Sequence, residues 1–200
     1  MGKNIVIAIG RQYGSGGREI GRRLAKMFDI DLYDKELLTL AAKESGFSEE
    51  IFKENDENNV GSLLYSIVMG GYQGNNLPLN HKLFLAQFDT IKKLAEEKSC
   101  IIIGRCADYA LEYNPNCIKV FVHAPLDYRI ERVVKFHGVS ENDAKDVIKK
   151  IDKKRENYYN FYTDKRWGDM ENYDITIKSS CAGIDGAVET IANLVREKMK

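Results

Sequence analysis

Glycines are concentrated in the stretch GRQYGSGGREIG, Gly10 to Gly21, which follows an apolar run and precedes a helical pattern. A glycine-rich turn allows consecutive backbone N–H groups to converge on one anion. The helix that follows would point its positive N-terminal end at the same anion. The pattern therefore predicts a phosphate site formed by Gly14, Ser15, Gly16, Gly17, Arg18 and Glu19.

The loop departs from the P-loop pattern G-x-x-x-x-G-K-[ST]. When the second glycine of the pattern is aligned with Gly17, Gln12 stands at the first glycine. Arg18 then stands at the lysine and can supply the cation, although its planar guanidinium differs from a compact ammonium. Glu19 stands at the hydroxyl, where it would coordinate Mg²⁺ or simply face solvent in the first turn of the helix. A tight turn that only joins strand to helix remains an alternative.

Two charged residues, Arg105 and Asp108, follow the apolar run Cys100–Ile103. If that run is a strand, both residues stand just past its carboxyl end, where open α/β sheets bind their ligands. The alternative is that they belong to an exposed helix start.

Residues 139–172 form a charged, tyrosine-rich segment that contains Lys154, Arg155 and Arg166. Taken by itself, a run such as KKIDKKREN is typical of a solvated helix face. Arg129 and Arg132 lie before this segment in the sequence. They are about one helical turn apart, so they can face the same site. The three histidines are isolated, and none has the spacing of a zinc site.

Five apolar or extended runs predict strands that alternate with helices. The strands are expected at Ile5–Ile9, ended by Gly10, at DIDLYD, at Cys100–Ile103, at Cys117–His123 and at YDITIKS. Helices are expected after the glycine loop, from Lys35 to about Glu44, from Lys82 to Lys98, from Pro125 to Gly138 and from Ile184 to about Met199. This alternation predicts a doubly wound α/β sheet, and residues 46–80 fall outside it as an insert.

Composition limits the classes of partner. The 200 residues suit one domain, and 30 Lys and Arg balance 30 Asp and Glu, so no global positive field would attract nucleic acid or an anionic membrane. The four cysteines lack a CxxC pair and are expected to be reduced thiols. The sequence contains no apolar run of about 20 residues and no signal-peptide core, so a cytoplasmic location is expected.

Four segments carry a resemblance that spans nearly the whole chain: GRQYGSGGREIGRRLA, YDKELL, GRCADYALEYNPNCIKVFVHAPLDYRIERV and YYNFYTDKRWGDMENYDITIKSS. They resemble the cytidylate kinase-like family of P-loop nucleoside monophosphate kinases. The resemblance implies a P-loop NTPase-type three-layer α/β/α fold with a five-stranded parallel sheet. One domain, 1–200, would comprise a core (1–45, 81–138 and 173–200), an acceptor-side insert (46–80) and a helical lid region (139–172).

The same resemblance implies ATP-dependent phosphoryl transfer to a nucleoside monophosphate, with CMP or dCMP as acceptor and with ATP and Mg²⁺ as cofactors. Its partners would be small-molecule nucleotides. The glycine loop would hold the donor phosphates, and Arg18, Lys154 and Arg155 would be catalytic. Glu19 or Asp34 would hold Mg²⁺. The acceptor would contact Tyr33, Asp34, Arg105 and Asp108, and Arg129, Arg132 and Arg166 are further lid or phosphate candidates.

The chain departs from the family where GRCAD replaces GRDIG, which displaces Asp108 from the usual position of a base-reading acid. Two alternatives stay open. The unusual insert allows a P-loop kinase with a different small-molecule acceptor, and the loop with Gln12, Arg18 and Glu19 allows a catalytically degenerate nucleotide-binding sensor module. The sequence does not distinguish a monomer from a homodimer.

Overall fold

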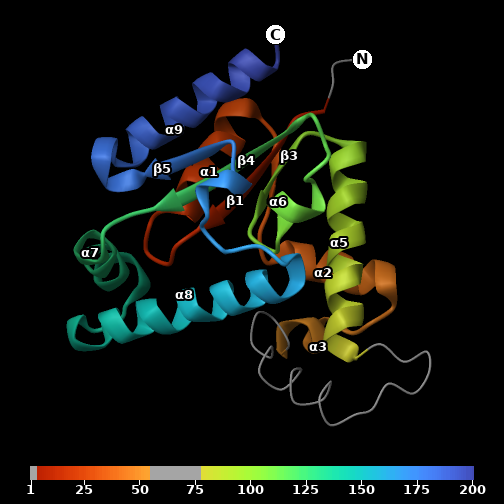
Figure 1. The fold of residues 1–200 in the computed structure, drawn as a ribbon, viewed down its shortest axis with the longest axis horizontal. Coiled ribbons are helices and arrows are strands. Elements are labelled where there is room, and N and C mark those ends of the chain that lie inside the picture. The colour runs from red at the N-terminus through yellow and green to blue at the C-terminus, as the bar shows by residue number, and fades with distance from the viewer. Residues whose placement is uncertain (1–3, 55–77) are drawn as a thin grey trace.

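The computed structural model describes residues 4–54 and 78–200 and contains the predicted five-stranded parallel sheet (Figure 1). The strands lie in the order β2-β3-β1-β4-β5, so β1 is central. Their bounds are β1 (Val6–Arg11), β2 (Asp31–Tyr33), β3 (Cys100–Ile103), β4 (Cys117–His123) and β5 (Ile175–Lys178). The consecutive strands β3 and β4 lie on opposite sides of β1, so the strand order reverses there. Open α/β sheets bind their ligands at the carboxyl ends of the strands beside such a reversal.

The helices of the described residues are α1 (Gly17–Phe28), α2 (Glu36–Ser45), α3 (Glu49–Glu54), α5 (Leu79–Glu97), α6 (Ala107–Ala110), α7 (Leu126–His137), α8 (Glu141–Thr163) and α9 (Ser179–Lys198). The sequence did not predict the short helix α6. In α9 the backbone leaves helical geometry at Ala182 and Gly183, so regular helix begins at Ile184, as expected. Most of the predicted insert 46–80 lies outside the described residues.

Strand β1 is longer than the sequence suggested. Gly10 was expected to end it, but Gly10 pairs with Phe121 and Arg11 pairs with Val122 of β4. Position 10 of the strand favours glycine because a Cβ atom there would lie 2.9 Å from the Phe121 ring and 3.3 Å from the Tyr173 ring. The expectation was wrong because the longer strand β4 continues the ladder past the end of β3, and Arg11 becomes part of the sheet.

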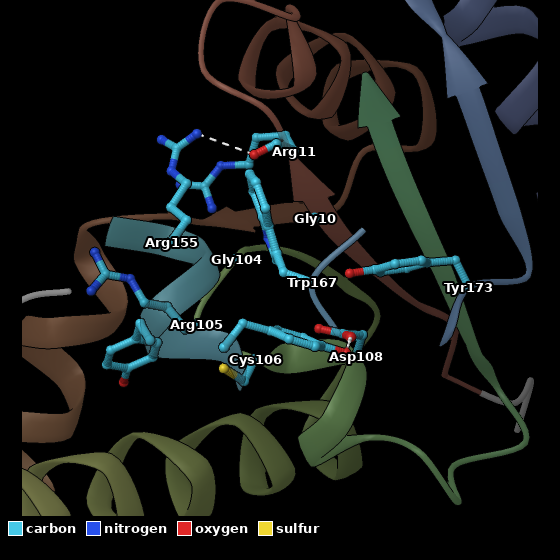
Figure 2. Close-up of a pocket in the computed structure, with 11 residues that line it drawn as sticks. Gly10, Arg11, Gly104, Arg105, Cys106, Asp108, Arg155, Trp167 and Tyr173 are labelled. Atoms are coloured by element: carbon cyan, nitrogen blue, oxygen red, sulfur yellow. Dashed lines mark hydrogen bonds between the residues drawn. The ribbon is translucent and has the colours of Figure 1, made fainter. Parts of the chain in front are cut away.

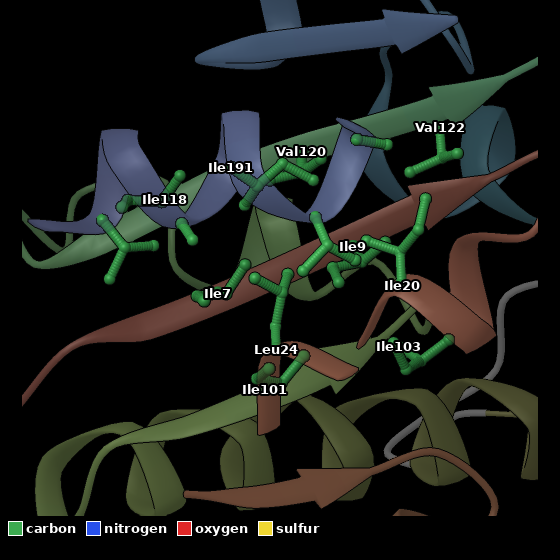
Figure 3. Close-up of a cluster of buried hydrophobic side chains, with 14 of the residues drawn as sticks. Ile7, Ile9, Ile20, Leu24, Ile101, Ile103, Ile118, Val120, Val122 and Ile191 are labelled. Atoms are coloured by element: carbon green, nitrogen blue, oxygen red, sulfur yellow. The ribbon is translucent and has the colours of Figure 1, made fainter. Parts of the chain in front are cut away.

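The two faces of β1 bury alternate residues against different helices. Ile7 and Ile9 face α1 and α9, where they pack with Ile20, Leu24 and Ile191 (Figure 3). Val6 and Ala8 face the other side and pack against α2 and α5 through residues such as Leu37 and Ile91. A central parallel strand covered on both faces reads as a continuous apolar run, which explains the sequence IVIAI.

Helix α8 crosses below the carboxyl edge of the sheet in the view of Figure 1. Its Tyr158 and Tyr159 are buried in an aromatic cluster with Phe84 of α5 and with Cys106. Through this cluster the segment predicted as a lid packs against the core. None of the described helices combines the length and apolar character that a membrane crossing requires.

Candidate active site

The glycine loop lies between the end of β1 and the start of α1, with its backbone held close to α7. Gly14 and Gly16 have φ values of 79° and 87°, which favour glycine. A Cβ atom at Gly14 would lie 2.8 Å from Val133 and 2.9 Å from the carbonyl oxygen of Arg129. Helix α1 starts at Gly17, so the N–H groups of its first turn point out of the loop without intrahelical acceptors. This arrangement suits an anion.

Ser15 contributes to the loop through its backbone. Its side chain is fully buried, and the hydroxyl donates to the carbonyl oxygens of Gln12 at 2.8 Å and Val122 at 3.0 Å. The carbonyl oxygen of Ser15 in turn accepts from the Ser179 hydroxyl at 2.6 Å. These bonds fix the shape of the turn, so the Ser15 hydroxyl is directed away from the predicted phosphate site.

A cavity of about 670 Å³ opens in front of the loop, which is the size range of small-ligand sites. We call it the loop cavity. Its charged lining is mostly basic and includes Arg11, Arg18, Arg22, Lys35, Arg132 and Arg155, with Glu19 as its acidic member. Such a basic cavity at a helix N-terminus is suited to a polyphosphate.

Two of these arginines are already paired with carboxylates. Arg18 Nε lies 2.5 Å from Asp34 Oδ2, which follows β2, and Arg132 Nη2 lies 2.7 Å from Glu19 Oε2. Glu19 also accepts from Arg23 at 2.6 Å. Partial burial acts to raise the pKa of Glu19, but the hydrogen bonds from Arg132 and Arg23 outweigh it and hold the pKa below its ordinary value. Glu19 therefore stays ionised at neutral pH.

His137, at the end of α7, also lines the loop cavity. Burial lowers its pKa, and the positive charges of Arg18, Arg132 and Arg155 lower it further. Its Nδ1 lies 3.1 Å from the Tyr13 hydroxyl. The lowered pKa of His137 therefore reflects burial first and the positive charge around this cavity second.

Helix α8 is docked on the loop by two polar contacts. Asp152 accepts from the backbone N–H of Tyr13 at 2.7 Å and forms an ion pair with Arg129 at 2.5 Å. One turn further, Arg155 donates to the carbonyl oxygen of Arg11 at 3.1 Å. Arg129 is therefore a support of the loop, whereas Arg155 reaches the cavity itself.

A second, much smaller cavity lies past the carboxyl end of β3 (Figure 2). We call it the inner cavity. Its volume is about 20 Å³, enough for about one water molecule. Gly104, Arg105 and Cys106 form one wall, with φ values of 74°, 57° and 53°. Consecutive left-handed conformations at two residues other than glycine cost free energy and are typical of functional sites.

Asp108 and Arg105 bring buried charge to the inner cavity. Asp108 is nearly fully buried, and its Oδ2 accepts from the Tyr159 hydroxyl at 2.6 Å. Burial raises the pKa of Asp108, and the hydrogen bond from Tyr159 only partly opposes this. Burial also lowers the pKa of Arg105 to about 10, which leaves it charged at neutral pH.

The structure brings most of the predicted site residues together. The loop cavity is lined by Gly14, Gly16, Gly17, Arg18, Glu19, Arg132 and Arg155, and the inner cavity by Arg105, Asp108 and again Arg155. Asp34 contacts the site through Arg18. Lys154, Arg166 and Tyr33 are not among the lining residues of either cavity.

Sequence reasoning missed Arg11. This residue is 8% exposed, and it shares with Arg155 the property of lining both cavities. The available signal was its position directly after the first strand and six residues before Gly17, but the expectation that Gly10 ends the strand placed Arg11 in a loop.

The donor set for Mg²⁺ favours Asp34 over Glu19. Both carboxylate oxygens of Glu19 are occupied by arginines, whereas Asp34 is buried beside the loop with one arginine partner. Within residues 4–54 and 78–200, no group of three or more His, Cys, Asp or Glu side chains could hold a metal ion by itself. A Mg²⁺ ion near the loop would therefore need water or ligand oxygens in addition to a carboxylate.

Comparison with known proteins identifies the family and the fold of the chain. The sequence profile described as the cytidylate kinase-like family matches residues 6–181. The chain belongs to the cytidylate kinase-like family. A relative, the cytidylate kinase of Methanopyrus kandleri, is 25% identical over 186 residues, which cover 88% of this chain and 86% of the relative.

Solved structures extend the comparison for this cytidylate kinase-like chain. An uncharacterized protein from Eubacterium ventriosum is 33% identical, with a TM-score of 0.74 and coverage of 96% of this chain and 99% of the other. The shikimate kinase of Bacteroides thetaiotaomicron is 15% identical, with a TM-score of 0.55 and coverage of 96% and 98%. The gluconokinase of Sinorhizobium meliloti is 12% identical, with a TM-score of 0.53 and coverage of 98% and 97%. The last two establish a P-loop kinase-type α/β fold.

Proposed function

We propose that this protein transfers the γ-phosphoryl group of ATP to a nucleoside monophosphate, with CMP or dCMP as acceptor. Family and fold indicate a small-molecule kinase. The observation that carries the finer proposal is the pair of cavities that meet at Arg11 and Arg155. One cavity surrounds a glycine loop and a helix N-terminus, and the other contains Arg105 and Asp108.

The donor would occupy the loop cavity, with its phosphates on the amides of Gly14 to Gly17 and against the nearby arginines. Mg²⁺, when bound with ATP near Asp34, supplies further neutralisation of phosphate charge. Phosphoryl transfer depends on positioning and on electrostatic stabilisation of the transferring group, so the site needs no side-chain nucleophile. Arg18 and Arg155 both line the loop cavity and would supply positive charge to the transferring group.

The acceptor would bind on the β3 side, with Arg105 toward its phosphate and Asp108 toward an exocyclic amine. Cytosine offers such an amine. The inner cavity of about 20 Å³ is too small for a nucleotide, so helix α8 and its aromatic residues would have to move outward to admit one. Closure afterwards would exclude water from the reaction.

The first test is an ADP-release assay with ATP and Mg²⁺ against CMP, dCMP, UMP, AMP and GMP, with a control lacking acceptor. Turnover that is highest on CMP or dCMP supports the proposal. If only a small molecule outside this panel is phosphorylated, the result would favour the different-acceptor alternative. The aromatic walls of the inner cavity are the observation that keeps this alternative open. If no monophosphate of the panel is phosphorylated but ATP still binds, the result would favour the sensor module.

A matched pair of variants tests the loop assignment. Arg18 and Arg196 are both helical arginines with a carboxylate partner and with side chains 41% and 47% exposed. We expect Arg18→Ala to lower kcat/KM for ATP at least tenfold because it removes a cation from the loop cavity, whereas Arg196→Ala leaves kcat/KM unchanged. Equal activity of the two variants in the same assay would contradict the loop assignment.

A further inference from the structure

The glycine loop itself contains no lysine, and the first residue of α1 could not carry a long side chain. A Cβ atom at Gly17 would lie 2.7 Å from Arg11 Cβ and 3.2 Å from Arg11 Cγ. The side chain of Arg11 therefore fills the space into which a side chain at position 17 would project. A long side chain at position 11 therefore excludes a long side chain at position 17, and the reverse also holds.

These two positions have the spacing of two fixed positions in the P-loop pattern. In G-x-x-x-x-G-K-[ST], the lysine follows the first glycine by six residues and the second glycine by one. When the second glycine of the pattern is aligned with Gly16 instead of Gly17, Arg11 stands at the first glycine and Gly17 stands at the lysine. Relative to the pattern, the small residue and the cation have exchanged places. Because the two positions touch, the exchange keeps a cation in the same region.

The path of Arg11 is shaped by a second glycine. A Cβ atom at Gly104 would collide with Arg11 Nη1, and Gly104 has a φ of 74°. The absence of side chains at Gly17 and Gly104 thus allows the guanidinium to lie between the loop and the end of β3. Figure 2 shows Arg11 and Arg155 together on one side of the inner cavity. Both arginines also line the loop cavity.

The charge of Arg11 distinguishes it from its neighbours. Arg18, Arg129 and Arg132 are ion-paired with Asp34, Asp152 and Glu19 respectively. Among residues 4–54 and 78–200, no carboxylate forms an ion pair with Arg11, although it is only 8% exposed. A buried cation without a counterion destabilises the fold, so its retention points to an anionic ligand.

We propose that Arg11 replaces the P-loop lysine and contacts the β- and γ-phosphates of the donor at the junction of the two cavities. This inference rests on the proposed function. In the transfer, the bond between the γ-phosphorus and the β–γ bridging oxygen breaks, and its electron pair remains on ADP. A lone pair of the acceptor phosphate oxygen forms the new P–O bond, so no proton has to move. The guanidinium of Arg11 offsets the charge on the transferring group.

The test compares Arg11→Gln with the wild-type protein in kcat, in ATP affinity and in melting temperature. We expect kcat to fall about 100-fold and ATP affinity at least tenfold, while AMP affinity stays within twofold, because AMP lacks both phosphates that Arg11 contacts. The melting temperature should stay equal or rise because an unpaired buried charge is removed. A residue with only a structural role would lower the melting temperature and leave both ligand affinities unchanged.

A swap variant tests the exchange itself. R11G/G17K recreates G-x-x-x-x-G-K in this chain, and we expect it to recover at least tenfold in ATP affinity and kcat over Arg11→Gly alone. Gly17→Lys alone should lose activity because its side chain meets Arg11. If Arg11→Gln retains both kcat and ATP affinity within threefold, or if R11G/G17K does no better than Arg11→Gly, the proposal is overturned.

The two proposals can fail separately. A wild-type protein that binds ATP but phosphorylates no monophosphate would contradict the proposed function, and the loss of ATP affinity in Arg11→Gln would still support the role of Arg11. Conversely, wild-type turnover of CMP together with an unaffected Arg11→Gln variant would preserve the function and reject the role of Arg11.

Discussion

At the scale of single residues, the site is made by charges that are buried for different reasons. Arg129 and Arg132 have carboxylate partners and hold the loop in place, whereas Asp108 has a hydroxyl partner, Tyr159, in a nearly dry cavity. A carboxylate that is buried with only a neutral hydrogen-bond donor is costly to ionise. Asp108 therefore gives a measurable signature of the inner cavity that does not depend on any substrate.

The pH dependence of stability should reveal Asp108. Because the folded-state pKa of Asp108 is raised, the folded protein binds its proton more readily than the unfolded chain does. The contribution of Asp108 to stability is therefore most favourable at low pH and is lost as pH rises through the folded-state pKa. We expect the free energy of unfolding of Asp108→Asn, relative to wild type, to be higher at pH 7 than at pH 4.

Urea denaturation of both proteins at the two pH values gives this difference directly. The comparison within each pH cancels the carboxylates whose pKa values are lowered, such as Asp31 and Glu44. A difference that is independent of pH would show that Asp108 ionises normally.

At the scale of elements, helix α8 connects the glycine loop to the inner cavity. The middle of α8 contacts the loop through Asp152 and Arg155, and the next turn covers the β3 side with Tyr158 and Tyr159. One rigid helix of 23 residues can therefore move both contacts together. Under the proposed function, such a helix would act as a lid that closes over donor and acceptor together.

Asp152→Asn should loosen α8 from the loop. The Arg129–Asp152 pair is largely buried, so loss of the negative charge leaves a buried guanidinium poorly compensated, at a cost of about 3 kcal/mol. We expect faster hydrogen exchange at the amides of α8, measured by mass spectrometry, with the amides of β1 little changed. Glu156→Gln is the matched control, because its pair with Lys153 is exposed and contributes little. Equal exchange in the two variants would argue against docking through Asp152.

At the scale of the whole molecule, the site depends on a sheet whose central strand is buried on both faces. The alternate side chains of β1 pack into two separate apolar clusters, and the glycine loop starts directly where this strand ends. The packed core therefore restrains the strand end from which the glycine loop starts. Because helices pack on both faces of the parallel sheet, a void in either layer would weaken the packing of β1.

Ile7→Ala should measure this support. Ile7 is fully buried in the cluster between the sheet, α1 and α9, and its truncation should lower the free energy of unfolding by about 2–5 kcal/mol. Chemical denaturation followed by circular dichroism provides the value. Met199→Ala serves as the control, since Met199 is 60% exposed and should change the value by less than about 0.5 kcal/mol. A loss below 1 kcal/mol for Ile7→Ala would mean that the cluster relaxes into the void.

The sequence by itself determined the alternation of strands and helices, the five-stranded sheet and the glycine loop. Each depends on local signals: apolar runs of strand length, helical periodicity and glycines at a turn. The order of residues alone also placed Arg18 at a helix start and Arg105 and Asp108 after a strand end, and these residues line the two cavities. Arg155 was selected only through the family resemblance, because its charged run by itself is typical of a solvated helix face.

Tertiary structure alone decided which charges are available to a ligand. Arg18 and Arg132 are paired with carboxylates from elsewhere in the chain, whereas Arg11 is buried between Gly17 and Gly104. The extension of β1 to Arg11 depends on its ladder with β4, which lies more than a hundred residues along the chain. Such pairings arise between segments distant in sequence, so no local pattern encodes them, and they determine where the cations of the site lie.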